Sequence, residues 1–209
     1  MAYAYNPVIG VLAGADMPLE QLRRSVEGAE FIFAADGAAN RLREVGVVPT
    51  ATIGDLDSLK SPENAGLVIH DQGQDDSDCD KLLRLIQSRG FTSVTLVGAE
   101  GDRLDHVLGT LFSAVRSGLD VQFILRRAHG WLIRPGSVVT VAAPLGAGAS
   151  LMPIDPCELV DLSGVEWPLA NVRLTPTGQV SLSNRVTAPE VRVEILSGSA
   201  LLTVLTDGS

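Results

Sequence analysis

Lysine is scarce in this chain, and Lys60 and Lys81 are the only two among 209 residues. Proteins that bind nucleic acid hold its phosphate backbone with clustered lysine and arginine side chains. The net charge of −9 is also of the wrong sign for such a partner. We therefore expect no nucleic-acid-binding function.

Cysteine and histidine are also few. The two cysteines, Cys79 and Cys157, have no metal-binding spacing and do not make the disulfide framework of a secreted protein. A single disulfide between them is an alternative that the sequence does not decide. The three histidines, His70, His106 and His129, have no paired spacing. A zinc site is therefore not expected.

Long apolar runs and several well-known motifs are missing. No apolar run approaches the roughly 20 residues of a membrane-spanning helix, and the start has no basic stretch followed by a cleavage site. We expect a cytoplasmic protein in a reducing compartment, without a membrane partner. The phosphate loop of P-loop kinases, the serine-hydrolase elbow and the dinucleotide-binding glycine fingerprint are absent too.

The chain does carry enough apolar residues, 45%, for a sizeable core. In the first half, short apolar runs alternate with helical periods, which favours a doubly wound, mostly parallel α/β domain. From residue 130 onward, short β-like runs are separated by Gly, Pro and Asn, which is typical of a β-sandwich. We predict an α/β domain over residues 1–128 and a β-sandwich over residues 129–209.

The apolar pattern also predicts the individual elements. Ser77 is the expected N-cap of the third helix. The predicted strands of the first half are 8–13, 31–35, 50–53, 67–70, 93–97 and 121–125, and its helices are about 19–26, 38–45, 78–89 and 105–117. The predicted strands of the second half are 131–134, 138–142, 150–152, 158–163, 172–174, 180–183, 191–196 and 201–205.

Aspartate, in contrast, is concentrated, and ten aspartates lie between Asp36 and Asp105. Carboxylates repel one another, so gathering them costs stability unless a divalent cation such as Mg²⁺ binds among them. Several follow predicted strands, and an open α/β sheet binds its ligands beyond the carboxyl ends of its strands. We expect four such loops to form one crevice. At any single position, a turn or a helix cap is the alternative reason for aspartate.

The sharpest acidic segment is 53–58, Ile-Gly-Asp-Leu-Asp-Ser. In an extended backbone the carboxylates of Asp55 and Asp57 would point to the same side and reach one ion or two adjacent ions. Asp78, at the start of a predicted helix, would add a third carboxylate. Lys81, one turn later, offsets charge or touches a phosphate; its alternative is an ion pair within the helix.

Arg103 places a cation within the acidic set. Its planar guanidinium suits phosphate oxygens. The alternative role of this arginine is a local salt bridge to Asp102 or Asp105. His106 follows directly, and the residues alone assign it no chemistry.

Six short segments, taken in order, resemble the thiamine pyrophosphokinase family. The order is collinear and spans nearly the whole chain, and the family's α/β nucleotide domain and β-sandwich agree with the two predicted halves. The resemblance also implies a homodimer. The segments are 36–40 (Asp-Gly-Ala-Ala-Asn), 46–49 (Gly-Val-Val-Pro), 53–58, 74–78 (Gln-Asp-Asp-Ser-Asp), 103–106 (Arg-Leu-Asp-His) and 183–184 (Ser-Asn).

The resemblance implies a Mg²⁺-dependent reaction in which ATP and thiamine give AMP and thiamine diphosphate. The implied metal ligands are Asp55, Asp57 and Asp78, and Arg103 and Asp105 complete the catalytic set. The implied ATP-binding residues are Asp36, Gly37, Asn40, Gly98, Arg103, Asp105 and His106, and the implied thiamine-binding residues are Gln74, Ser181, Ser183 and Asn184.

The sequence departs from the family pattern at three places. Asp102 and Ala38 stand where the family often has glycine, and no aromatic residue closely follows Asn184. Trp167 matches a different family element, either as a core residue or as a ligand contact. Two alternatives stay open: a related enzyme acting on another alcohol, and a nucleotide-binding module without catalysis.

Overall fold

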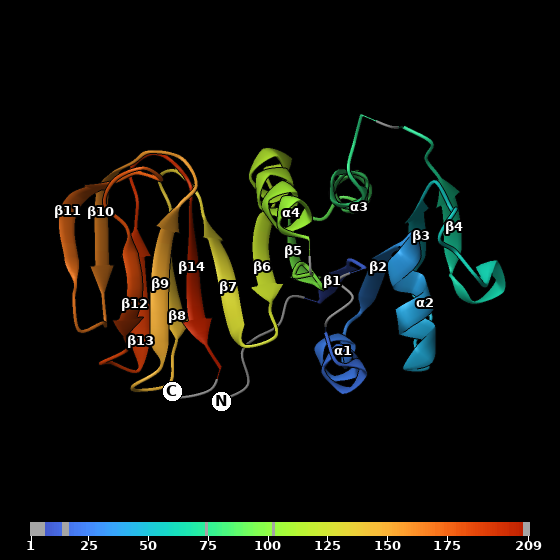
Figure 1. Cartoon of the computed structure of the whole chain (residues 1–209), viewed down its shortest axis with the longest axis horizontal. Helices are drawn as coiled ribbons and strands as arrows, with labels where there is room; N and C mark the ends of the chain where they lie inside the picture. Colours follow the sequence, from blue (N-terminus) through green and yellow to red (C-terminus); the bar gives the residue numbers. More distant parts are fainter. Residues whose placement is uncertain (1–6, 14–16, 74, 102, 207–209) are drawn as a thin grey trace. The chain divides into compact units, whose positions relative to one another are not determined.

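The computed structural model describes residues 7–13, 17–73, 75–101 and 103–206 (Figure 1). The chain divides into two compact units, Met1–Arg126 (unit 1) and Arg127–Ser209 (unit 2). This division lies close to the boundary that the change in apolar pattern predicts.

A parallel sheet forms the frame of unit 1, so the predicted α/β class is confirmed. Its strands lie in the order β6-β5-β1-β2-β3-β4, and each neighbouring pair is parallel. The strands are β1 (Val8–Val11), β2 (Phe31–Ala35), β3 (Ala51–Gly54), β4 (Leu67–His70), β5 (Ser93–Val97) and β6 (Asp120–Ile124).

The helices of unit 1 cover both faces of this sheet (Figure 1). The chain order of the strands reverses between β1 and β5. Because parallel crossovers are right-handed, the helices before and after the reversal must lie on opposite faces. Helices α1 (Leu19–Val26) and α2 (Asp36–Glu44) pack together on one face, and α3 (Asp78–Ser88) and α4 (Leu104–Ser117) pack together on the other. The reversal creates the crevice at which such sheets bind ligands.

Helix α3 lies close over the centre of the sheet. Its residues Leu82, Leu83 and Ile86 are buried, as the predicted helical face requires. A Cβ atom at Gly10 of β1 would lie 2.8 Å from a methyl carbon of Leu96 and 3.3 Å from one of Leu82. Glycine at this position therefore lets the helix approach the strand.

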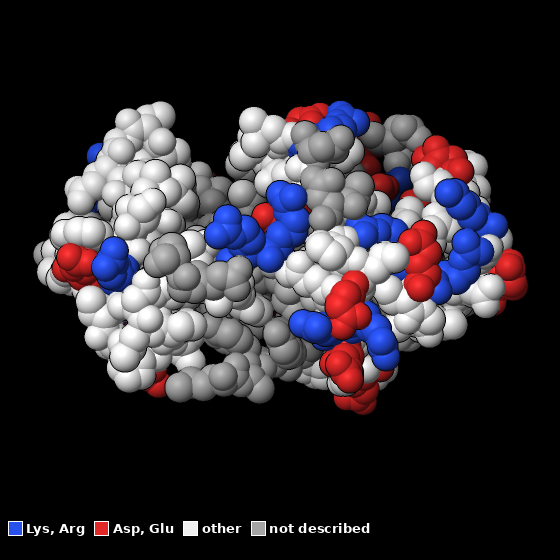
Figure 2. Space-filling model, turned by 60° about the horizontal axis from the view of Figure 1, so that its bottom comes forward, with Lys and Arg blue, Asp and Glu red and all other residues white. Residues whose placement is uncertain are grey.

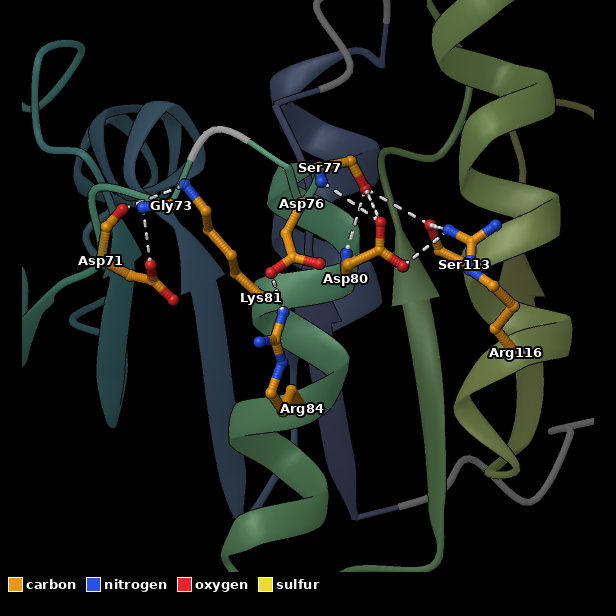
Figure 3. A network of polar contacts seen from close by, with 9 residues as sticks. All are labelled: Asp71, Gly73, Asp76, Ser77, Asp80, Lys81, Arg84, Ser113 and Arg116. Carbon is orange, nitrogen blue, oxygen red and sulfur yellow. Dashed lines mark hydrogen bonds and ion pairs between the residues drawn. The ribbon is translucent and has the colours of Figure 1, made fainter.

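The start of α3 is fixed by the predicted cap. The hydroxyl of Ser77 accepts a hydrogen bond from Asp80 N at 3.1 Å, and the Asp80 carboxylate accepts one from Ser77 N at 3.2 Å. Arg116 of α4 donates to the same carboxylate at 2.8 Å (Figure 3). This reciprocal pattern is a capping box, and the prediction that Ser77 caps the helix is confirmed.

Unit 2 is built of two antiparallel sheets, which confirms the predicted β-sandwich. In β14 the buried positions alternate with partly exposed ones, as expected where one face of a sheet packs on a core. Four strands of unit 2 are antiparallel neighbours in the order β12-β9-β14-β7, and the other four form a sheet in the order β11-β10-β13-β8. The strands are β7 (Ala128–Ile133), β8 (Val138–Ala142), β9 (Gly148–Pro153), β10 (Cys157–Ser163), β11 (Leu169–Leu174), β12 (Ser181–Arg185), β13 (Glu190–Glu194) and β14 (Ala200–Leu205).

Several details differ from the prediction. Helix α2 begins at Asp36, immediately after β2, so the expected start at residue 38 was too late. A short 3₁₀ helix at Pro62–Asn64 was not predicted. Cys79 and Cys157 are both buried free thiols, so the alternative of a disulfide between them is not realised. No helix of the described residues is both long and apolar enough to cross a membrane.

Charged side chains are denser over unit 1 than over unit 2 on the face shown in Figure 2. There Lys and Arg lie among Asp and Glu. Two of the ion pairs of unit 1 are Arg24 with Glu20 at 3.0 Å and Arg84 with Asp76 at 2.6 Å. Several cations of this unit are therefore already matched by nearby acids.

We expect Ser77→Ala to lower the free energy of unfolding by about 1 kcal/mol, because the substitution removes the hydroxyl that caps α3. Ser77→Thr keeps the hydroxyl and is the matched control. Urea unfolding followed by circular dichroism measures both variants. Equal midpoints for Ser77→Ala and the wild type would contradict a stabilising role of the cap.

Candidate functional site

A cavity of about 490 Å³ lies in unit 1 where the order of strands reverses. It is lined by residues that follow β1 and β5 and by residues at the starts of α3 and α4. This is the place at which the sequence predicts a crevice. The predicted site residues in the lining are Asp55, Asp78, Gly98, Arg103, Asp105 and His106.

Three carboxylates lie together at one side of this region. One ligand oxygen each from Asp36, Asp55 and Asp57 lies within 4.8 Å of the others. Asp36 was expected in the nucleotide pocket, and its position beside the other two was not foreseen from the sequence. Oxygen ligands at this spacing suit a hard divalent cation such as Mg²⁺.

Asp36 is buried, with only 4% of its surface exposed. Its two carboxylate oxygens accept hydrogen bonds from Gly37 N at 2.6 Å and from Leu56 N at 3.0 Å. Burial raises the pKa of Asp36, and the charges of Asp78 and Asp55 raise it further, although the two hydrogen bonds oppose the shift. The carboxylate therefore lies in an environment that an added positive charge would relieve.

The backbone of the acidic loop is not extended, so this part of the prediction was wrong. Leu56 adopts the left-handed conformation, with φ of 68°, and the residues around it form a bend. Asp57 N donates to the Asp55 carboxylate at 3.2 Å. This hydrogen bond is the main reason that the pKa of Asp55 is lowered. The two carboxylates thus converge through a turn instead of through the alternation of a strand.

Gly54 is needed for close approach. A Cβ atom at this position would lie 2.6 Å from Cγ of Asp36, which is a severe overlap. Only glycine therefore leaves room for the Asp36 side chain at the end of β3. The φ angle of Gly54 is not in the left-handed region, so close approach and not a turn explains the glycine.

The carboxylates of this region fall into two groups, those paired with arginine and those without an ion pair among the described residues. Asp76, Asp80 and Asp105 are all engaged in ion pairs with arginine. Asp78 lies at the first position of α3, close enough for its charge to raise the pKa of Asp36. Among the described residues, no ion pair involves Asp36, Asp55, Asp57 or Asp78.

Arg103 and Asp105 bind one another at the rim of the cavity. The guanidinium reaches the two carboxylate oxygens at 3.3 and 2.6 Å, and this arginine lowers the pKa of Asp105. Both side chains are largely exposed, at 63% and 65%. The local salt bridge that the sequence left open is therefore present, in a pair that also lines the cavity.

Asn40 connects α2 to the acidic loop. Its side-chain amide donates to Ser58 O at 2.7 Å and accepts from Lys60 N at 2.9 Å. Among the described residues, the predicted nucleotide contacts Gly37 and Asn40 lie outside the cavity lining. In this structure Asn40 fixes the path of the chain beyond Asp57.

In unit 2, the predicted site residue Asn184 is buried and holds the backbone of Trp167. Its amide group donates to Trp167 O at 2.7 Å and to Ser181 Oγ at 3.3 Å. Its oxygen accepts from Trp167 N at 3.1 Å and from Arg185 N at 2.9 Å. A side-chain amide offers two donors and two acceptor lone pairs, so all four are used within unit 2.

Trp167 itself is exposed, with 58% of its surface accessible to solvent. The sequence left this residue undecided between core and ligand contact, and the structure excludes the core. Ser183 is also exposed and lies in the left-handed conformation at an irregularity between β12 and β9. The other predicted thiamine contact, Gln74, lies outside the described residues.

Both halves of the chain match known families. Residues 22–123 match the family described as "Thiamin pyrophosphokinase, catalytic domain", and residues 140–201 match "Thiamin pyrophosphokinase, vitamin B1 binding domain". The chain is 22% identical over 165 residues to a thiamine pyrophosphokinase of Bacillus subtilis, covering 74% of this chain and 77% of that protein.

Solved structures share the fold. The thiamine pyrophosphokinase structure of Bacillus subtilis matches with a TM-score of 0.80 and 20% identity, over 96% of this chain and 99% of that chain. The thiamin pyrophosphokinase of Candida albicans matches with a TM-score of 0.80 and 18% identity, over 99% of this chain and 95% of that chain. At these identities the likeness establishes the architecture.

We expect Gly54→Ala to weaken Mg²⁺ binding by about 10- to 100-fold, the usual effect of disturbing a residue that orients a ligand. The added methyl group must displace the Asp36 carboxylate. Gly101→Ala is the matched control, because its Cβ would meet no atom within 4 Å in the same cavity. Calorimetric titration with Mg²⁺ measures the affinity, and an unchanged affinity in Gly54→Ala would contradict a contribution of Asp36 to the metal site.

Proposed function

We propose that this chain, which belongs to the thiamin pyrophosphokinase family, transfers the pyrophosphoryl group of ATP to the hydroxyl of thiamine. The products would be AMP and thiamine diphosphate. The observation that carries the proposal is the match of both halves, one to a catalytic domain and the other to a vitamin B1 binding domain. A homodimer, implied by the resemblance, and a cytoplasmic location, expected from the sequence, are part of the proposal.

The carboxylate cluster of unit 1 fits Mg²⁺. Its ligand oxygens lie within 4.8 Å of one another, and the buried member, Asp36, is in an environment that raises its pKa. Asp55 and Asp57 would hold the ion, with Asp36 beside them and Asp78 contributing from the start of α3. When bound, the ion supplies positive charge that stabilises the polyphosphate during transfer.

The other residues of the cavity would bind and orient ATP. The exposed Arg103–Asp105 pair can exchange its local salt bridge for contacts to the nucleotide, since solvent already reaches both side chains. Gly98 and His106 line the same cavity, and Gly37 and Asn40 would act by shaping the acidic loop. Pyrophosphoryl transfer depends mainly on such positioning and charge stabilisation.

Trp167 would provide the aromatic surface for thiamine in unit 2. The exposed indole supports this role, because a flat aromatic ring stacks well on another aromatic ring. Asn184 would act by holding Trp167, and Ser181 and Ser183 keep their proposed place as thiamine contacts of unit 2. Gln74, which belongs to unit 1, stays a proposed thiamine contact. An aromatic contact from Trp167 would take the place of the aromatic residue that is missing after Asn184, and this supports thiamine over another alcohol as the substrate.

Incubation of the purified protein with ATP, Mg²⁺ and thiamine tests the reaction. We expect AMP and thiamine diphosphate in equal amounts, measured by chromatography. ADP with thiamine monophosphate would overturn pyrophosphoryl transfer. No consumption of ATP would favour the non-catalytic nucleotide-binding module.

We expect Asp57→Asn to reduce kcat at least about 100-fold, equivalent to about 2.7 kcal/mol of lost transition-state stabilisation. Asparagine has nearly the same shape but no charge. Circular dichroism should show an intact fold. Turnover close to the wild-type value would remove Asp57 from the metal site.

We expect Trp167→Ala to raise the KM for thiamine about tenfold, since an aromatic contact and the area it covers are lost. The KM for ATP should stay unchanged, because ATP is proposed to bind in unit 1. Leu145→Ala is the control, since Leu145 is also a large exposed apolar residue of unit 2, with 68% of its surface exposed. An unchanged KM for thiamine would exclude Trp167 from the site.

A further inference from the structure

Lys81 is one of only two lysines in the chain, and it is buried at the cavity. Only 4% of its surface is exposed. Lysine is almost never fully buried unless its charge is compensated. A buried ammonium group in the lining of a cavity therefore needs a physical explanation.

The side chain of Lys81 makes few hydrogen bonds within the described residues. Its Nζ donates to the carbonyl oxygen of Asp71, at 3.0 Å, in the segment between β4 and α3 (Figure 3). An ammonium group has three donors, and within the described part of the chain this is the hydrogen bond that Nζ makes. Two donors therefore remain available on a side chain that lines the cavity.

The charge of Lys81 is also unmatched by an ion pair. Arg84, Arg103 and Arg116 surround the same region, and each lies within 4 Å of a carboxylate oxygen. Within the described residues, Lys81 has no carboxylate oxygen at ion-pair distance. The pKa of Asp55 is lowered mainly by the hydrogen bond from Asp57 N. The positive charge of Lys81 lowers it too, but by less.

The position of Lys81 on α3 defines what it faces. It lies in the lining together with Asp55, whose side chain belongs to the carboxylate cluster, and Asp78, which precedes it on the same helix. The alternative ion pair within the helix is not formed, since Asp80 pairs with Arg116 instead. Lys81 thus lines the same cavity as Asp55 and Asp78, two of the proposed metal ligands, where the phosphate chain of a nucleotide would bind.

We propose that Lys81 is a catalytic residue that binds phosphate oxygens in the polyphosphate of a nucleoside triphosphate. The available donors and the unpaired charge suit a multiply charged anion, and burial strengthens a charge-assisted hydrogen bond. The inference rests on the proposed function, because it takes ATP as the ligand of this cavity. It adds a direct contact from the protein to the phosphates that the carboxylates approach only through Mg²⁺.

Nucleotide affinity measured without thiamine separates this role from a structural one. The probes are ATP and AMP, each with Mg²⁺, titrated into the full chain by calorimetry. We expect Lys81→Met to lose at least about tenfold in affinity for ATP, the effect of one charge-assisted hydrogen bond. Its affinity for AMP, which lacks the β- and γ-phosphates, should change less than about twofold.

Lys60→Met is the matched control, because it removes the other lysine, which is exposed and whose backbone N–H binds Asn40. We expect it to bind both nucleotides as the wild type does. Lys81→Arg keeps the charge and should retain more ATP affinity than Lys81→Met. If Lys81→Met does not fold, Lys81→Gln, which keeps an uncharged N–H donor, should show the same selective loss.

Two results would overturn the inference while leaving the proposed function intact. Equal ATP affinity in Lys81→Met and the wild type would show that Lys81 does not touch the phosphates. An equal loss of ATP and AMP affinity, with a lower melting temperature, would show that Lys81 only supports the segment at Asp71. Failure of the wild-type protein to bind either nucleotide would instead overturn both the inference and the proposed function.

Discussion

Two backbone amides hold the carboxylate of Asp36, and the geometry of the acidic end of unit 1 depends on them. Gly37 N fixes one oxygen at the start of α2, and Leu56 N fixes the other from the loop after β3. The second bond connects two neighbouring strand ends and draws the loop over Gly54, where no side chain would fit. These hydrogen bonds keep the carboxylates close together although they repel one another, and a bound cation would reduce this repulsion.

The distribution of cations supports this view of the site. Arg84, Arg116 and Arg103 form ion pairs with Asp76, Asp80 and Asp105, and none of these three pairs includes a carboxylate of the cluster. Lys81 lines the cavity, and within the described residues its Nζ uses one of three hydrogen-bond donors. Surface ion pairs contribute little to stability. Among the described residues, the site charges without an ion pair include the buried Asp36 carboxylate, the more exposed Asp55 and Asp57 carboxylates and the buried Lys81 ammonium.

Much of the fold was predictable because its signals are local. Strands β2, β4, β5 and β8 lie where the apolar runs place them, and α3 begins after the expected cap at Ser77. The start of α2 was misplaced, since no loop separates it from β2. The acidic segments were also correctly expected beyond strand ends, because parallel strands all end at the same edge of the sheet.

The sequence by itself determined the fold class, the elements and the gathering of aspartates, since apolar periodicity and turn residues act over a few positions. Only the tertiary structure decided which side chains meet. Asp36 reaches Leu56 across 20 positions, and Asn184 reaches Trp167 across 17. Such contacts depend on strand order and close packing, and these also decide that Lys81 is buried and Trp167 exposed. No local pattern contains that information, because it arises only when distant segments share one core.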